Sequence, residues 1–168
     1  MPTAEELAEK RELARLESMP MLRDLQDAGV LVEDVWDIKH PDHYPECIPV
    51  IINYLDADFD PNVFSGMAQK LSVPEIVNSW DLLLAGYESQ PDDGKRGSIA
   101  NAIAKFMNKD RYESVRRVLL NADNGKSRLV ILRDVKKKFR GALGRELLEE
   151  LVNDPDIGWL AKEKLGKK

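Results

Sequence analysis

A dense group of cations between residues 110 and 145 is the part of this sequence best equipped for binding chemistry. The segment carries 11 Lys and Arg residues against 4 Asp and Glu residues, although the whole chain has a formal net charge of −5. The cations expected on its two neighbouring helices are Arg116, Arg117, Lys126, Arg128, Arg133, Lys136, Lys137, Lys138 and Arg140. Guanidinium and ammonium groups at this density could bind carboxylates or phosphates.

The same cations also have a purely structural explanation. On a helix starting near Gly125, one buried stripe is predicted to consist of Leu129, Leu132, Val135 and Phe139. The opposite arc is predicted to carry Arg133, Lys136, Lys137 and Arg140. Lysines near a helix C-terminus are also favoured by the helix dipole, without any ligand. The sequence therefore leaves two alternatives, a solvated helix face and a docking patch for an acidic partner.

The charge distribution bears on which acidic partner would fit. Residues 1–60 carry 5 Lys and Arg against 15 Asp and Glu, so an acidic front precedes the basic segment. Nucleic acid is one candidate partner, because cations that displace phosphate counterions supply most nonspecific affinity. An acidic overall pI of about 5.2 and the lack of aromatic residues among the cations weigh against it. A protein partner is the preferred expectation.

Other residues that could do chemistry have weaker patterns. His40 and His43 stand near Asp42 and Glu46, but a proline-broken loop does not hold such residues in a defined metal geometry. Cys47 is expected to be a small buried apolar residue and not a nucleophile. We expect no metal, no cofactor and no catalytic residues.

Composition places the chain among soluble helical domains. Its 168 residues fit about one domain, with 43% hydrophobic and 33% charged residues. A single cysteine cannot form an intramolecular disulfide, which favours a reducing, cytoplasmic setting. We expect neither a signal peptide nor a membrane-spanning segment, because no apolar run is long enough.

The first 43 residues are predicted to form an N-terminal helical cap. Thr3 and Glu6 have the spacing of a capping box, and the helix that they start is expected to run to about Ser18. Met19-Pro20 should break it, and a second short helix should end at Gly29.

From residue 44 onward the pattern predicts four helix pairs in one compact domain, 44–168. The expected pairs are 44–58 with 60–73, 73–89 with 92–107, 110–123 with 124–139, and 141–154 with 154–168. Asp60, Asp92 and Asn124 recur at a spacing of 32 residues, and Asp154 follows 30 residues later. Each is a residue type that caps helix N-termini. A period near 32 that repeats caps and apolar positions is typical of an α-solenoid.

These segments resemble the HEAT repeat family, and more closely short bacterial HEAT-like repeat proteins. The similarity lies in DPNVFSGMAQKL, DGKRGSIANAIAKF and GKSRLVILRDV, at the start of successive second helices. It implies an all-α, right-handed solenoid in which Arg96 and Arg128 bridge neighbouring pairs and helix carbonyls, or line the inner face. Phe64 and Gly158 stand where arginine would be usual. Of the acidic ladder positions only Asp58 matches, so an arginine–aspartate ladder is incomplete.

The function that follows from this resemblance is a non-catalytic interaction or scaffold module that binds a protein on its concave face. A nucleic-acid-binding protein similar to the HEAT-like alkylpurine glycosylases is the second hypothesis, although no motif assigns a catalytic carboxylate. A toxin-neutralising immunity protein is the third. The chain has only two histidines, and so lacks the repeated His-Glu pairs of iron-dependent HEAT-like hydroxylases.

Overall fold

The computed structural model describes residues 3–166, and this part of the chain is helical without any β-strand. The α-helices are α1 (Ala4–Asp27), α2 (Cys47–Asn53), α3 (Pro61–Gln69), α4 (Trp80–Ser89), α5 (Asp93–Phe106), α6 (Tyr112–Leu120), α7 (Arg128–Leu132), α8 (Val135–Lys138), α9 (Ala142–Leu151) and α10 (Gly158–Leu165). Short 3-10 helices join them: η1 (Val35–Asp37), η2 (Pro74–Ser79), η3 (Lys109–Arg111) and η4 (Ala122–Ser127). The all-α fold class predicted from the sequence is confirmed.

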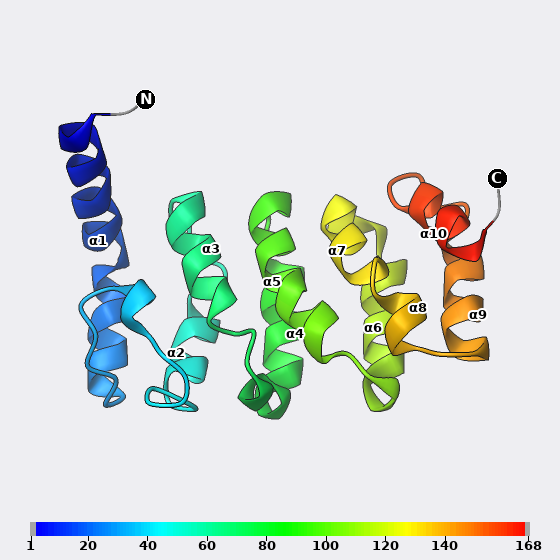
Figure 1. Ribbon diagram of the computed structural model, residues 1–168, viewed down its shortest axis with the longest axis horizontal. Helices are drawn as coiled ribbons and strands as arrows, with labels where there is room; N and C mark the ends of the chain where they lie inside the picture. The colour runs from blue at the N-terminus through cyan, green and yellow to red at the C-terminus, as the bar shows by residue number, and fades with distance from the viewer. Residues whose placement is uncertain (1–2, 167–168) are drawn as a thin grey trace.

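The helices stand side by side in chain order, from α1 at one end to α9 and α10 at the other (Figure 1). After α1 we group them in chain order as α2/α3, α4/α5, α6/α7–α8 and α9/α10, and the two members are in contact in α4/α5, α6/α7 and α9/α10. First helices pack on first helices, as α2 does on α4 and α6 on α9. Second helices pack on second helices, since α5 lies between α3 and α7. The exposed faces of α3, α5 and α8 therefore lie next to one another.

A single hydrophobic core runs through all of these helices. Its buried members extend from Met21 in α1 to Ala161 in α10, and Leu132 in α7 is fully buried among them. Phe64 fills a core position with no exposed surface. Gly158 is required by close backbone approach, because a Cβ there would lie 2.7 Å from the carbonyl oxygen of Val152. Packing thus accounts for the residue types at these two positions.

The predicted break at Met19-Pro20 is wrong, because α1 continues through Pro20 to Asp27. Proline removes one N–H from the helix, but Met21 and Leu25 on the following turn are fully buried in the core. Burial of these side chains favours continuation of the helix beyond Pro20. The capping box of Thr3 and Glu6 is confirmed, and the chain leaves the helix at Gly29 with a φ of 86°, as predicted.

The long helix predicted from Gly125 to Phe139 is divided into η4, α7 and α8. Gly125 has φ 58° and ψ −149°, which is outside the helical region.

The predicted N-cap role of Asn124 is wrong, because its side chain is buried and donates to the carbonyl oxygen of Val118. Asp60 and Asp92 cap α3 and α5 as predicted, by accepting from the backbone N–H of Asn62 and Lys95. Asp154 caps the turn before α10 instead of the helix itself.

Candidate functional site

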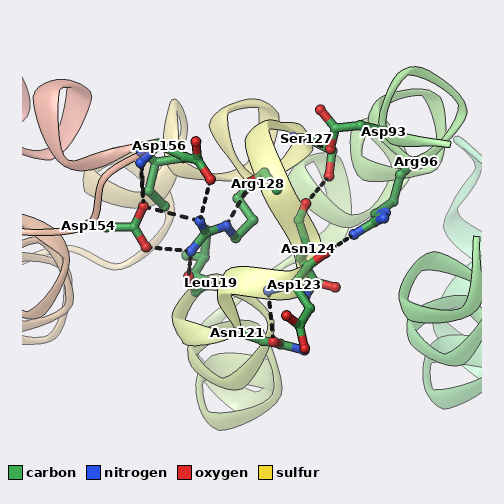
Figure 2. Close-up of polar contacts among 12 residues, drawn as sticks. Asp93, Arg96, Leu119, Asn121, Asp123, Asn124, Ser127, Arg128, Asp154 and Asp156 are labelled. Atoms are coloured by element: carbon green, nitrogen blue, oxygen red, sulfur yellow. Dashed lines mark hydrogen bonds and ion pairs between the residues drawn. The ribbon is translucent and has the colours of Figure 1, made fainter. Parts of the chain in front are cut away.

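Arg96 and Arg128 occupy matched places in α5 and α7, and both are directed into the protein (Figure 2). Arg96 is 8% exposed and donates to the backbone carbonyl oxygens of Gln90 and, across to the next helix pair, Asp123. Arg128 has no exposed surface and donates to the carbonyl oxygens of Gly125 and Leu119. The guanidinium groups of both arginines thus donate hydrogen bonds to backbone carbonyl oxygens at or near helix ends.

The charge of Arg128 is balanced by carboxylates that precede α10. Its Nη1 and Nη2 atoms lie 2.7 Å and 3.1 Å from the two carboxylate oxygens of Asp154, and Asp156 lies 3.7 Å away (Figure 2). Burial raises the pKa of Asp154, but the hydrogen bonds from Arg128 and from two backbone N–H groups outweigh it, so the pKa lies below its usual value. This ion pair ties the third helix pair to the fourth.

Two of the predicted binding residues in α6 form ion pairs with the neighbouring first helices. Arg116 donates from Nε to Glu150 in α9 at 3.0 Å, and Arg117 lies 3.4 Å from Glu88 in α4. Glu150 holds the pKa of Arg116 above its usual value through this hydrogen bond. The cations of α6 therefore have carboxylate partners on both sides and lie away from the second helices.

The four cations predicted on the solvent arc, Arg133, Lys136, Lys137 and Arg140, are all exposed. The structure separates them into two groups. Arg133 and Lys137 border a groove over α3, α5 and α8, whereas Lys136 and Arg140 lie beside α9 and α10. Lys136 donates to the backbone carbonyl of Lys164. The side chains of Arg133 and Lys137 form no hydrogen bond or ion pair with residues 3–166, so their charges are available.

The groove crosses the exposed faces of three successive second helices and has a volume of about 620 Å³. Among the polar residues that line it are Gln69 from α3, Asn101 from α5 and Arg133 after α7. Lys105 and Lys137 line it one turn further along their helices. Lys105 donates to the carbonyl oxygen of Ser72 at 2.8 Å, which holds that side chain across the α3–α5 junction.

The comparisons with known proteins give no assignment. Neither the protein-family models, nor the curated proteins, nor the solved structures contain a match to this chain. The groove must therefore be interpreted from its own residues.

Sequence reasoning missed Gln69 and Asn101, although a signal was present. Gln69, Asn101 and Arg133 are spaced by 32 residues, the same period that relates Asp60 to Asp92. Lys105 and Lys137 share that period as well. Polar residues that recur at the period of the caps and core mark a common exposed face. A search for charged residues alone does not find Gln69 and Asn101, because both side chains are neutral.

The residues considered for metal binding or catalysis have ordinary structural partners. The His40 ring lies 2.8 Å from a carboxylate oxygen of Glu75, and the ring of His43 accepts from the backbone N–H of Lys39. Cys47 is buried, and burial raises its pKa to about 11. Within residues 3–166, no group of three or more His, Cys, Asp or Glu side chains is arranged to hold a metal ion.

None of the described helices combines the length and the apolar character that crossing a bilayer requires.

Proposed function

We propose that this chain is a non-catalytic interaction module built as a right-handed α-solenoid of four HEAT-like helix pairs behind an N-terminal cap of residues 1–43. Three observations support the arrangement. Second helices pack on second helices in chain order. Asp60 and Asp92 cap equivalent helices. Arg96 and Arg128, which are 32 residues apart, each donate to a backbone carbonyl at the end of the preceding helix. In such a protein the stacked second helices form the binding face.

The partner that best fits this face is an acidic, extended segment of another protein. The observation that carries this proposal is the row of Gln69, Asn101 and Arg133 along the groove, with Lys105 and Lys137 beside it. Side-chain amides can both donate to and accept from a peptide backbone. Arg133 and Lys137 would bind carboxylates, and an arginine can do so with two parallel hydrogen bonds.

The spacing of the helices sets the length of the segment. Packed helices lie about 8–10 Å apart, so three of them extend over roughly 20 Å. An extended chain rises about 3.3 Å per residue, so six or so residues would cross the groove. The acidic side chains should lie at the end of the segment over α8, because Arg133 and Lys137 are there.

A nucleic acid fits the groove less well. No aromatic side chain lines it, so unpaired bases would find no stacking surface. Asp134 also lines it beside Arg133 and would repel a phosphate. The acidic residues 1–60 add a further repulsion at low ionic strength.

The proposal can be tested by NMR titration of the labelled protein at physiological ionic strength. The probes are a synthetic peptide of about nine residues with three Asp or Glu at one end, enough to cross the groove, and a single-stranded oligothymidine. We expect the peptide to shift the backbone amide signals of Asn101, Lys105, Arg133 and Lys137 at lower concentration than the oligonucleotide does.

A matched pair of double variants distinguishes binding in the groove from attraction by the overall net charge. Arg133→Glu with Lys137→Glu should abolish the shifts, whereas Lys126→Glu with Arg140→Glu changes the net charge equally outside the groove and should preserve them. Equal losses in both variants would show that only diffuse charge attracts the peptide. Tighter binding of the oligonucleotide would place the nucleic-acid hypothesis first.

A further inference from the structure

A second groove, apolar and rimmed by carboxylates, lies at the opposite end of the molecule from the basic segment. The N-terminal half of α1 extends beyond the ends of α3 and α5 (Figure 1). Leu13 and Leu16 of α1 are 59% and 54% exposed. Between α1 and the start of α3 the groove has a volume of about 630 Å³, with Leu13, Ala14, Trp36 and Val63 supplying its apolar lining.

Trp36 forms a fixed floor for this groove. A Cβ atom at Gly66 of α3 would lie 2.5 Å from the Trp36 ring, so the ring rests directly on the helix backbone. Lys70 donates to the backbone carbonyl of Trp36 and lies 5.9 Å from the ring centroid. Even so, 52% of Trp36 is exposed. A tryptophan held in this way presents an apolar surface without further loss of conformational freedom on binding.

The wall made by α1 is tied in place as well. Both carboxylate oxygens of Glu17 accept from the backbone N–H of Asp60, each at 2.9 Å, which joins α1 to the N-terminus of α3. Side-chain contacts thus stabilise both the α1 wall and the Trp36 floor of the groove.

Glu17, Asp60 and Lys10 are the charged residues that line this groove, and carboxylates outnumber cations in the hollows beside it. Among the described side chains that line it and two adjoining hollows, the carboxylates are Glu6, Glu9, Glu12, Glu17, Asp34 and Asp60. The cations on the same surfaces are Lys10 and Arg15, and Arg15 is already paired with Glu12 at 2.8 Å. An apolar floor with an anionic rim is complementary to a helix that has leucine-like residues on one face and cations on its flanks.

We infer that this groove binds a basic amphipathic helix of a partner protein, with Trp36 and Leu13 as the apolar anchors. A second copy of this chain fits less well in a symmetric arrangement, because each copy would present the same acidic rim to the other. Tryptophan in a preformed apolar groove is a frequent centre of binding energy. This surface is separate from the groove over α3, α5 and α8, and the two differ in the sign of charge that they select.

The experiment uses fluorescence anisotropy at physiological ionic strength. The probe is a labelled synthetic helix of about 18 residues, roughly five turns, with leucines on one face and lysines on the other. Its control is a peptide of the same composition in scrambled order, which keeps the charge but has no apolar face. We expect saturable 1:1 binding of the amphipathic peptide and at least tenfold weaker binding of the scrambled one.

Matched variants locate the site. Leu13→Lys should weaken binding at least tenfold, whereas Leu82→Lys makes the same change at a leucine of similar exposure on α4 and should not. Trp36→Ala should weaken binding, whereas Trp159→Ala, at a comparably exposed tryptophan on α10, should not. Because Leu13 is exposed, its variant tests the groove even if Trp36→Ala disturbs folding.

Two results would overturn the inference. Equal binding of both peptides, or equal effects of Leu13→Lys and Leu82→Lys, would reduce the interaction to nonspecific charge. A wild-type dimer in sedimentation analysis that becomes monomeric with Leu13→Lys, together with no peptide binding, would show that a second copy occupies the groove.

Discussion

At the scale of single residues, the two buried arginines, Arg96 and Arg128, stabilise contacts between helices, and they lie 32 residues apart in the sequence. Arg128 has no exposed surface, and its guanidinium joins the end of α6 to the turn before α10. An arginine so buried has lost its hydration, and removal of one partner would leave an uncompensated charge. Arg96 is held mainly by backbone carbonyls. These two side chains are therefore not part of the proposed binding surface.

The ion pair of Arg128 and Asp154 predicts a dependence of stability on pH. The folded-state pKa of Asp154 lies below its ordinary value. Its contribution is therefore complete above the ordinary Asp pKa of about 3.9 and is lost as the pH falls through the folded-state pKa. In urea titrations, Asp154→Asn should be less stable than the wild type at neutral pH. The difference in free energy of unfolding should narrow as the pH falls below about 4.

Asp81→Asn provides the control, because it removes one exposed carboxylate on α4 without contacting Arg128. A difference between the wild type and Asp154→Asn that stays constant from neutral pH down to acid unfolding would contradict the assigned role of the pair.

At the scale of elements, the division of the third second helix into α7 and α8 places its side chains. The backbone N–H of Asp134 donates to Ile131, three residues earlier, so the chain tightens between the two short helices. Leu132, Val135 and Phe139 all remain buried across this turn. Arg133 and Lys137 then face the groove together. The predicted buried stripe is confirmed for these three residues, and Leu129 is only partly buried.

Leu132 should be one of the costly positions in the core. It is fully buried in α7, which packs against α5, α6 and α10. Leu132→Ala should therefore lower the free energy of unfolding by about 2–5 kcal/mol, the range for cavities left by buried leucines. The loss should appear in one cooperative urea transition, because neighbouring helix pairs share the core. The control is Leu82→Ala, at a leucine that is 58% exposed. A cost below about 0.5 kcal/mol, as at ordinary surface sites, would mean that Leu132 does not support the core.

At the scale of the whole molecule, the chain is divided by charge. The acidic segment 1–60 contains α1 and α2 at one end, while the basic segment 110–145 contains α6 to α8 and the start of α9 toward the other. Much of that basic charge is neutralised internally by Glu88, Glu150 and Asp154. The groove therefore offers few free cations, which favours a short acidic peptide over a long polyanion.

Binding to a heparin column tests whether the free cations are too few to hold a long polyanion. At a physiological ionic strength of about 0.15 M, charges beyond roughly 8 Å are screened, so only a local patch can retain the protein. We expect weak or no retention. Arg133→Glu with Lys137→Glu should change the stability by no more than about 0.5 kcal/mol per site, as ordinary surface substitutions do. Firm retention by the wild type that this double variant loses would instead identify a polyanion site.

Several features of the fold could be predicted because they depend on neighbours in the sequence. The capping box of Thr3 and Glu6, the caps at Asp60 and Asp92, and the end of the first helix by Gly29 involve groups a few residues apart. The apolar stripe of α7 and α8 follows from helical periodicity alone. The candidate cations were likewise visible as a group, although their partners were not.

What the sequence by itself determined was the all-helical class and the approximate positions of most helices, since caps, periodicity and turns act over less than one helix length. Only the tertiary structure decided that α1 continues through Pro20, that Asn124 turns inward, and that Arg116 and Arg117 pair with Glu150 and Glu88. Each of these outcomes depends on core burial or on a partner about 30 residues away. The grooves are decided at the same level, because each is formed by side chains from three separate segments that only packing brings together.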